Sequence, residues 1–215
     1  MYNHSIDWVV FSNRSQVHAM KMSDNYPRKK MPFKLTPKDE EEVRTYSGKQ
    51  SFIEVEDGYL VAFYRGEFAG YLFWFSKEGD KKYLIGKKLI VDFIRRDDKI
   101  YGIEGLAHMN MSNGSILEFE KAEDKWIYKE YVRLPAAPST INLDSNKNFI
   151  IVTLNSILSI DSTRGINILY ADAFWQYYLY PNSSVINDNS LYVGMRKGVF
   201  SFDIATTKKR WLLNH

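Results

Sequence analysis

Arginine side chains at comparable points of the sequence are the first candidates for a binding function. Arg14, Arg65 and Arg196 each occupy a short polar turn between apolar runs, and Lys197 follows Arg196 directly. A guanidinium group pairs with carboxylates or phosphates through a planar fork of donors, and arginine is common at the centres of protein interfaces. If these turns lie on one face of the fold, they form a partial ring of positive charge that suits an acidic partner. The alternative is that the turns are polar only because they are exposed.

An uncharged aromatic segment is the second candidate. Residues 174–180 read Phe-Trp-Gln-Tyr-Tyr-Leu-Tyr, with five aromatic side chains in seven residues. Exposed Trp and Tyr rings combine a large contact area with a polar end, which suits the recognition of protein or sugar. The candidate ligand-binding residues are Trp175, Tyr177, Tyr178 and Tyr180. The alternative, which we favour, is that these rings fill the core between neighbouring sheets.

Motifs for catalysis, metal binding or a cofactor do not emerge from the sequence. The histidines are His4, His18, His108 and His215, none with metal-ligand spacing, and the chain has no cysteine. We find no glycine-rich phosphate loop and no nucleophile elbow. Acidic pairs such as Asp97-Asp98 fall in turns, and nothing selects the two carboxylates that a glycan-cleaving enzyme requires. We therefore expect a binding protein without cofactor or metal rather than an enzyme.

The elements that position these residues are short strands that recur at a near-constant spacing. Five apolar runs end at Ser23, Ser76, Glu120, Asp161 and Asp203, so the successive steps are 53, 44, 41 and 42 residues. A period of about 40–45 residues built from alternating strands is typical of a β-propeller blade. The sequence thus predicts an all-β propeller of about five blades, each a four-stranded antiparallel sheet, with the first blade incomplete.

Each of the four later runs is preceded by two further strands joined by a turn rich in Asp, Asn and Gly, the residues that hairpin turns prefer. The expected first strands are 52–55, 91–94, 140–143 and 184–186. The expected second strands are 59–62, 100–103, 149–152 and 191–194. Candidates for fourth strands are 81–85, 126–129 and 209–213. In the first blade we expect only a second strand at 8–11 and a third at 17–22.

The last two repeat units resemble those of quinoprotein-type (PQQ-like) propellers. In that pattern an apolar strand ends in Asp, and a Thr-Gly turn, a Lys and a Trp follow. Here Ile157–Asp161 leads to Thr163-Arg164-Gly165, and Gly198–Asp203 leads to Thr206, Lys209 and Trp211. The Asp is expected to end the strand and to bond the amides of the turn. The resemblance implies the propeller fold and carries over no quinone or dehydrogenase site, since a shared fold does not supply a function.

Composition agrees with a single β-rich domain. Hydrophobic residues make up 45% and aromatic residues 15% of the 215 residues, which suits strands. We expect one domain over residues 1–215, with a charged loop insertion at about 25–49. A net charge of only +3 does not indicate nucleic-acid binding, and no apolar run is long enough to span a membrane.

No signal peptide is recognisable at the start of the sequence, and a chain without cysteine fits a reducing compartment. We expect a cytoplasmic protein on this basis; a trimmed N-terminus would leave a periplasmic or secreted protein open.

Together these features favour protein–protein recognition. We expect a non-enzymatic propeller whose Arg14, Arg65, Arg196 and Lys197 meet an acidic surface of a protein partner. A bacterial immunity protein that neutralises a toxin fits this size and composition. A lectin-like propeller that binds carbohydrate through residues 175–180 is the alternative, and a glycan-cleaving enzyme is a third reading.

Overall fold

The chain folds into successive antiparallel sheets. The computed structural model describes residues 7–13, 16–21, 31–38, 49–65, 69–108, 111–176 and 178–212. Within these residues lie four four-stranded sheets and one two-stranded sheet. Contacts divide the chain into two compact units: unit 1 comprises Met1–Pro27 and Pro138–His215, and unit 2 comprises Arg28–Ala137. Each unit is described on its own, and a single domain over the whole chain stays a prediction.

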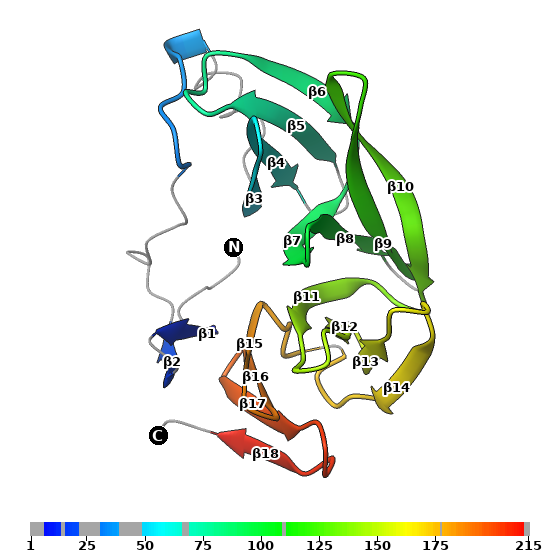
Figure 1. Cartoon of the computed structure of the whole chain (residues 1–215). Helices are drawn as coiled ribbons and strands as arrows, with labels where there is room; N and C mark the ends of the chain where they lie inside the picture. The colour runs from blue at the N-terminus through cyan, green and yellow to red at the C-terminus, as the bar shows by residue number, and fades with distance from the viewer. Residues whose placement is uncertain are drawn as a thin grey trace. The chain divides into compact units, whose positions relative to one another are not determined.

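Unit 2 contains two sheets, drawn in cyan to green in Figure 1. The first has the order β3 (Lys49–Val55), β4 (Gly58–Tyr64), β5 (Gly70–Ser76) and β6 (Lys82–Gly86). The second comprises β7 (Ile90–Arg96), β8 (Lys99–His108), β9 (Met111–Ala122) and β10 (Lys125–Leu134). Every strand pairs antiparallel with the next strand of the chain, so each sheet is a simple meander.

Unit 1 contains the remaining three sheets. The two-stranded sheet is β1 (Trp8–Asn13) with β2 (Gln16–Lys21). The next is β11 (Pro138–Leu143), β12 (Phe149–Thr153), β13 (Ile157–Ile160) and β14 (Ile166–Tyr170). The last is β15 (Ser183–Asn187), β16 (Ser190–Met195), β17 (Gly198–Asp203) and β18 (Lys209–Leu212).

The predicted strands match the observed ones closely, with one strand missed. Every expected first, second and third strand of the four later repeats overlaps a strand of the structure, as do the three fourth-strand candidates. No fourth strand is predicted for the third complete sheet, where the structure has β14. In the expected loop insertion, Pro37 and Lys38 are helical, and residues 39–48 lie outside the described residues. In the described part of the chain, no helix has the length and apolar character needed to cross a membrane.

First strands of successive sheets are joined by side-chain hydrogen bonds. In unit 2, Ser51 of β3 donates its hydroxyl to Asp92 of β7 at 3.0 Å. In unit 1, Ser184 of β15 donates to Thr140 of β11 at 2.6 Å. These hydrogen bonds satisfy polar side chains where the first strands of neighbouring sheets face each other.

The two-stranded sheet corrects one expectation. Strand β1 contacts β15, β16 and β17, just as β7, the first strand of its sheet, contacts β3, β4 and β5. In addition, the backbone amide of Val10 donates to the Ser183 hydroxyl at 3.0 Å. By these contacts β1 and β2 correspond to a first and a second strand, not to the second and third strands that the sequence analysis expected. The short segment showed two apolar runs, and only packing against β15 distinguishes their order.

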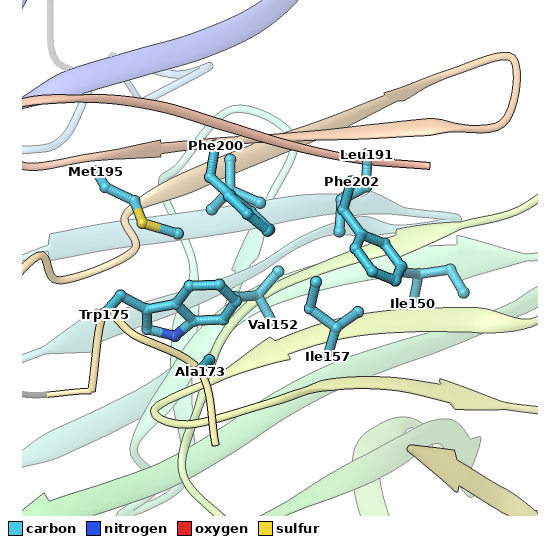
Figure 2. Close-up of a cluster of buried hydrophobic side chains, with 10 residues drawn as sticks. Ile150, Val152, Ile157, Ala173, Trp175, Leu191, Met195, Phe200 and Phe202 are labelled. Carbon is cyan, nitrogen blue, oxygen red and sulfur yellow. The ribbon is translucent and has the colours of Figure 1, made fainter. Parts of the chain in front are cut away.

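The core of unit 1 lies between the sheets β11–β14 and β15–β18. Figure 2 shows Val152 and Ile157 on one side, with the Trp175 indole beside Val152, and Phe200 and Phe202 on the other side. In unit 2, the corresponding cluster includes fully buried residues of both of its sheets, among them Leu60, Leu72 and Ile90. Alternating apolar residues on facing strands produce such cores because one side of each strand is covered.

Aspartates end two of the strands as the repeat pattern predicted. The Asp161 carboxylate accepts hydrogen bonds from the Thr163 hydroxyl at 2.6 Å and from the amides of Thr163 and Gly165 at 2.8 and 2.9 Å. These hydrogen bonds lower the pKa of Asp161, the bond from Thr163 most strongly. Asp203 likewise accepts from the Thr206 amide at 2.7 Å.

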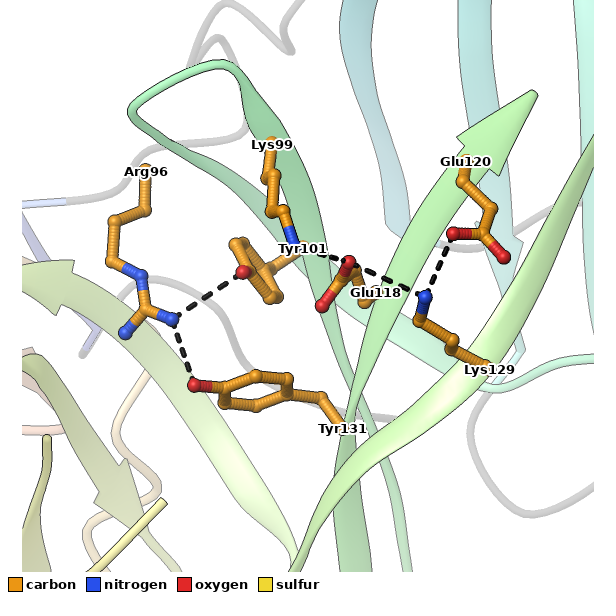
Figure 3. Close-up of polar contacts among 7 residues, drawn as sticks. All are labelled: Arg96, Lys99, Tyr101, Glu118, Glu120, Lys129 and Tyr131. Carbon is orange, nitrogen blue, oxygen red and sulfur yellow. Dashed lines mark hydrogen bonds and ion pairs between the residues drawn. The ribbon is translucent and has the colours of Figure 1, made fainter. Parts of the chain in front are cut away.

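A polar network crosses the second sheet of unit 2 (Figure 3). The buried Arg96 guanidinium donates to the hydroxyls of Tyr131 at 2.9 Å and Tyr101 at 3.3 Å. Beside it, the buried Glu118 carboxylate pairs with Lys99 at 2.9 Å and with Lys129 at 3.6 Å. Burial alone would raise the pKa of Glu118, but the bond and charge of Lys99, together with Lys129, outweigh it and the pKa lies below its usual value.

Candidate functional site

A cavity of about 580 Å³ opens in unit 1 between the outermost strands of its two complete sheets. The volume lies within the range of small-ligand sites. Its lining is mainly aromatic and basic. The residues around it are Tyr170, Phe174, Leu179, Lys197, Phe200, Lys209, Arg210 and Trp211. We call this cavity the aromatic pocket.

Edge-to-face ring contacts build the wall of the pocket. The centre of the Phe174 ring lies 5.3 Å from the centre of the Phe200 ring and 5.5 Å from that of the Trp211 ring. The planes of the Phe174 and Trp211 rings are close to perpendicular. Phe200 is buried, whereas 47% of the Phe174 surface is exposed. Aromatic rings packed edge to face hold one another in a defined orientation. The pocket is therefore a preformed apolar surface that remains open to a ligand.

Strand pairing explains why these residues meet. Phe200 of β17 pairs with Trp211 of β18, and Phe202 pairs with Lys209 two positions further on, so all four share one face of the sheet. Tyr170, the last residue of β14, stacks on Phe200 at 6.0 Å and on Phe202 at 6.2 Å. The pocket thus forms where the end of one sheet's outer strand faces the outer hairpin of the next.

Three basic residues surround the aromatic wall. The Lys209 ammonium lies 4.3 Å from the centre of the Tyr170 ring, which places a cation over an aromatic face. Lys197 and Arg210 are exposed. Among the described residues that line the pocket, none is a carboxylate. The arrangement suits an anionic ligand that carries an apolar or flat group.

Of the predicted basic residues that the structure describes, only Lys197 lines the aromatic pocket. It lies in the tight turn between β16 and β17 with φ of 66°, which exposes its side chain. Arg196 is half-buried, with its guanidinium 3.5 Å from the Asp7 carboxylate and stacked on Tyr180 at 4.2 Å. Asp7 also forms a backbone bridge with Arg196. Arg196 therefore holds the start of β1 against the β15–β18 sheet.

The other two arginines do not extend this site in the described structure. Arg65 is exposed in unit 2, where its amide donates to the Ala69 carbonyl at 2.9 Å. Arg14 lies outside the described residues. It falls between β1 and β2, a first-to-second strand turn, whereas Arg65 and Arg196 follow second strands.

The predicted aromatic segment divides between core and surface. Trp175 is completely buried and donates its indole N–H to the Thr153 carbonyl at 3.1 Å, which agrees with the core-packing alternative. Tyr178 is 77% exposed, and Tyr180 lies beneath Arg196. Tyr177 lies outside the described residues. Phe174, from the same segment but not among the candidates, lines the pocket instead.

Sequence reasoning missed most of the pocket. The sequence predicts Phe200, Lys209, Arg210 and Trp211 as strand or repeat-pattern residues and not as binding residues. The run Lys-Lys-Arg-Trp at 208–211 is the signal that could have found them, because it combines clustered cations with a Trp on an edge strand. In the described part of the chain, no cluster of three or more His, Asp or Glu side chains could hold a metal ion.

Comparison with known proteins bears on the fold. No protein-family model matches the sequence, and no curated protein matches it. Among solved structures, virginiamycin B lyase from Staphylococcus aureus is similar with a TM-score of 0.54 and 15% identity, over 79% of this chain and 56% of that chain. The extracellular domain of a hybrid two-component system from B. thetaiotaomicron is similar with a TM-score of 0.55 and 15% identity, over 77% of this chain and 22% of that chain.

These neighbours are β-propeller-like proteins, and this chain spans only part of their length. At such identity the likeness shows the fold alone, and the quinoprotein type of repeat stays a prediction. The protein is an all-β propeller fold, with four four-stranded antiparallel sheets and an incomplete two-stranded sheet in its described residues.

Proposed function

We propose that this propeller is a non-enzymatic binding protein that recognises a protein partner with an acidic surface through the aromatic pocket. The observation that carries the proposal is the placement of Lys197, Lys209 and Arg210 around an open aromatic wall whose described lining has no carboxylate. This charge pattern supports the predicted acidic partner but moves the contact from a ring of arginines to one pocket.

The pocket supplies both components of a protein contact. An apolar side chain of the partner can fill the space beside Phe174 and Trp211 and bury aromatic surface. Carboxylates beside that side chain then meet the exposed ammonium and guanidinium groups. Because these cations lie at the exposed rim, salt screens their contribution to the binding free energy. They mainly favour fast association and correct orientation of the partner. Neutralisation of a toxin by an immunity protein is one activity of this kind.

Carbohydrate recognition is a second candidate. The exposed rings of Phe174 and Tyr178 offer flat apolar surfaces of the kind on which sugars stack. The buried Trp175 no longer contributes to this reading. A glycan-cleaving reaction gains no support from the pocket, because it needs two carboxylates that the described lining does not provide.

A peptide array tests the proposal. The probes are eight-residue acidic peptides with alternating valines, each carrying one Tyr, Phe or Trp, beside versions in which Gln and Asn replace the acids. We expect the acidic peptides to bind the native protein and to lose about tenfold or more in affinity when Lys209 and Arg210 are both changed to Glu. The matched control is Lys208→Glu, which changes an exposed neighbour outside the pocket.

Either of two outcomes would overturn the proposal: equal binding of acidic and neutral peptides, or equal loss of affinity in the Lys208→Glu control. A glycan array run in parallel, with binding lost in Phe174→Ala, would instead establish the carbohydrate reading.

A further inference from the structure

We infer that the partner segment is an extended acidic peptide that adds as a fifth strand to the open edge of β14 and places one apolar side chain in the aromatic pocket. This inference rests on the proposed function and specifies how the partner binds. Such strand addition uses backbone hydrogen bonds for affinity and side-chain pockets for specificity.

The edge of β14 is free to pair. This strand is the last in its sheet, and within the described residues no other strand pairs with its outer side. Figure 1 shows it as the yellow arrow at the end of the sheet β11–β14. Its side chains Ile166 and Ile168 are 41% and 55% exposed. An edge strand with exposed apolar side chains is a ready template for another strand.

The other outer strands of the complete sheets carry charged residues that discourage pairing, and β14 does not. Strand β6 begins with Lys82, and β18 begins with Lys209 and Arg210. Strand β10 contains both lysines and glutamates. The sequence of β14 is Ile-Asn-Ile-Leu-Tyr, without charge or proline. Charged residues are a usual protection of sheet edges, so β14, unlike the fourth strands of the other three complete sheets, lacks this protection.

The backbone of β14 offers donors to an incoming strand. At the hairpin, the Asp161 amide donates to the Gly165 carbonyl at 3.2 Å, which makes these residues a hydrogen-bonded pair. The next pairs of the ladder join Ile166 to Ile160, Asn167 to Ser159 and Ile168 to Leu158. Since hydrogen-bonded and non-bonded pairs alternate in an antiparallel ladder, the amides of Ile166 and Ile168 point away from β13 toward the open edge.

The edge leads directly to the pocket. Tyr170, which ends β14, also lines the aromatic pocket and lies beneath the Lys209 ammonium. At about 3.3 Å per residue, a strand of five residues covers β14 from Ile166 to Tyr170. Residues of the peptide beyond Tyr170 then lie among Lys197, Lys209 and Arg210, which favours acidic side chains there. Charge complementarity thus selects an acidic peptide from the segments that could pair with this edge.

A substitution that removes one backbone donor tests the pairing. Ile168→Pro deletes an amide that points to the open edge, and proline is tolerated on the outer side of an edge strand. Its matched control is Ile168→Thr, which keeps the amide and the β-branched shape. With the acidic valine peptides of the array as probes, we expect about tenfold weaker binding for Ile168→Pro and less than about threefold for Ile168→Thr.

Two measurements keep the test decisive if Ile168→Pro does not fold. Peptides N-methylated at alternate positions should lose affinity when the methyl group faces β14 and keep it when the methyl group faces away. In the native protein, hydrogen exchange at the amides of Ile166 and Ile168 should slow when the peptide is added.

One outcome would overturn strand addition and leave the proposed function standing. In it, the peptide binds and quenches the Trp211 fluorescence, but both amides stay unprotected and every N-methylated peptide still binds. Failure of every acidic peptide to bind better than its neutral counterpart would overturn the proposed function itself.

Discussion

The ammonium group of Lys209 lies over the ring of Tyr170, 4.3 Å from its centre, and so joins the outermost strand of one sheet to the end of the outermost strand of the next. This contact places a positive charge beside the aromatic pocket, and among the described residues no carboxylate forms an ion pair with it. A cation held in this way orients an arriving anion and stays available to it.

The first prediction concerns this charge. Lys209→Met keeps an apolar stem of similar length over Tyr170 but removes the ammonium. We expect the affinity for the acidic peptides to fall about fivefold at low salt, and the difference from the native protein to shrink toward zero at about 0.5 M salt, because salt screens exposed charges. Titration at several salt concentrations measures this, with Lys208→Met as control. A salt-independent loss would show that packing, not charge, is responsible.

The second prediction concerns Trp175. Its indole is completely buried between the two complete sheets of unit 1 and donates to the Thr153 carbonyl. Trp175→Ala leaves a large cavity and an unpaired carbonyl, and we expect it to lower the free energy of unfolding by about 3–5 kcal/mol. Trp175→Phe should cost less, because most of the ring volume remains. Denaturant titration followed by circular dichroism measures both, and a native-like midpoint for Trp175→Ala would contradict the burial.

The third prediction concerns pH and the Asp57 carboxylate of unit 2. One of its oxygens accepts hydrogen bonds from the indoles of Trp74 at 3.0 Å and Trp126 at 2.9 Å, and the other pairs with the Lys121 ammonium at 2.9 Å. Burial alone would raise the pKa of Asp57, but these donors outweigh it and the pKa lies below its usual value. The ionised Asp57 carboxylate therefore stabilises the folded state fully above about pH 4, which is the pKa of Asp in the unfolded chain. This stabilisation is lost as the pH falls through the lower pKa of Asp57 in the folded state.

Asp57→Asn should accordingly lower the free energy of unfolding by about 1–3 kcal/mol at neutral pH. The gap between variant and native protein should narrow as pH falls below about 4. Urea titrations from about pH 3 to 7 measure the difference in free energy of unfolding between the two proteins. A difference that is constant over this range would refute the role of the carboxylate charge. Glu56→Gln, at the neighbouring exposed partner of Lys121, serves as the control.

The fourth prediction concerns Arg96, whose guanidinium reaches the hydroxyls of both Tyr101 and Tyr131. A lysine ammonium lacks the planar fork of donors, so Arg96→Lys should destabilise the protein by about 1–3 kcal/mol. Tyr131→Phe removes only one of the two acceptors and should cost about 1 kcal/mol. Thermal unfolding of the two variants compares them, and an unchanged melting temperature in Arg96→Lys would show that the network adds nothing to stability.

The repeat was predictable from the sequence because its signals are local. A turn of Asp, Asn or Gly between alternating apolar runs specifies a hairpin within about a dozen residues, and the Asp161 and Asp203 turns behave as expected. Strand β14 was not predicted because Ile-Asn-Ile-Leu-Tyr is short and its alternation of apolar and polar residues ends after Ile168.

The pocket could not be read from the sequence because its parts come together only through tertiary contacts. Phe174 and Trp211 lie far apart in the chain, and their rings meet only after β18 pairs with β17 and the segment after β14 folds back. The same packing buries Trp175 and exposes its neighbour Phe174, a distinction that periodicity in an irregular segment does not make. Lys197 was found because a turn position alone predicts exposure.

The packing of β1 on β15 has a consequence for the order of folding. Val10 and Ser183, which bond to each other, are 173 residues apart, whereas every partner strand of unit 2 lies within one continuous segment, residues 28–137. During synthesis, β1 and β2 leave the ribosome long before the strands that cover them exist. Unit 2 can complete its sheets first, and the early strands must wait with Val9 and Val10 uncovered. We therefore expect this long-range contact to close more slowly than the sheets of unit 2 form, and we expect the uncovered early strands to favour aggregation until it does.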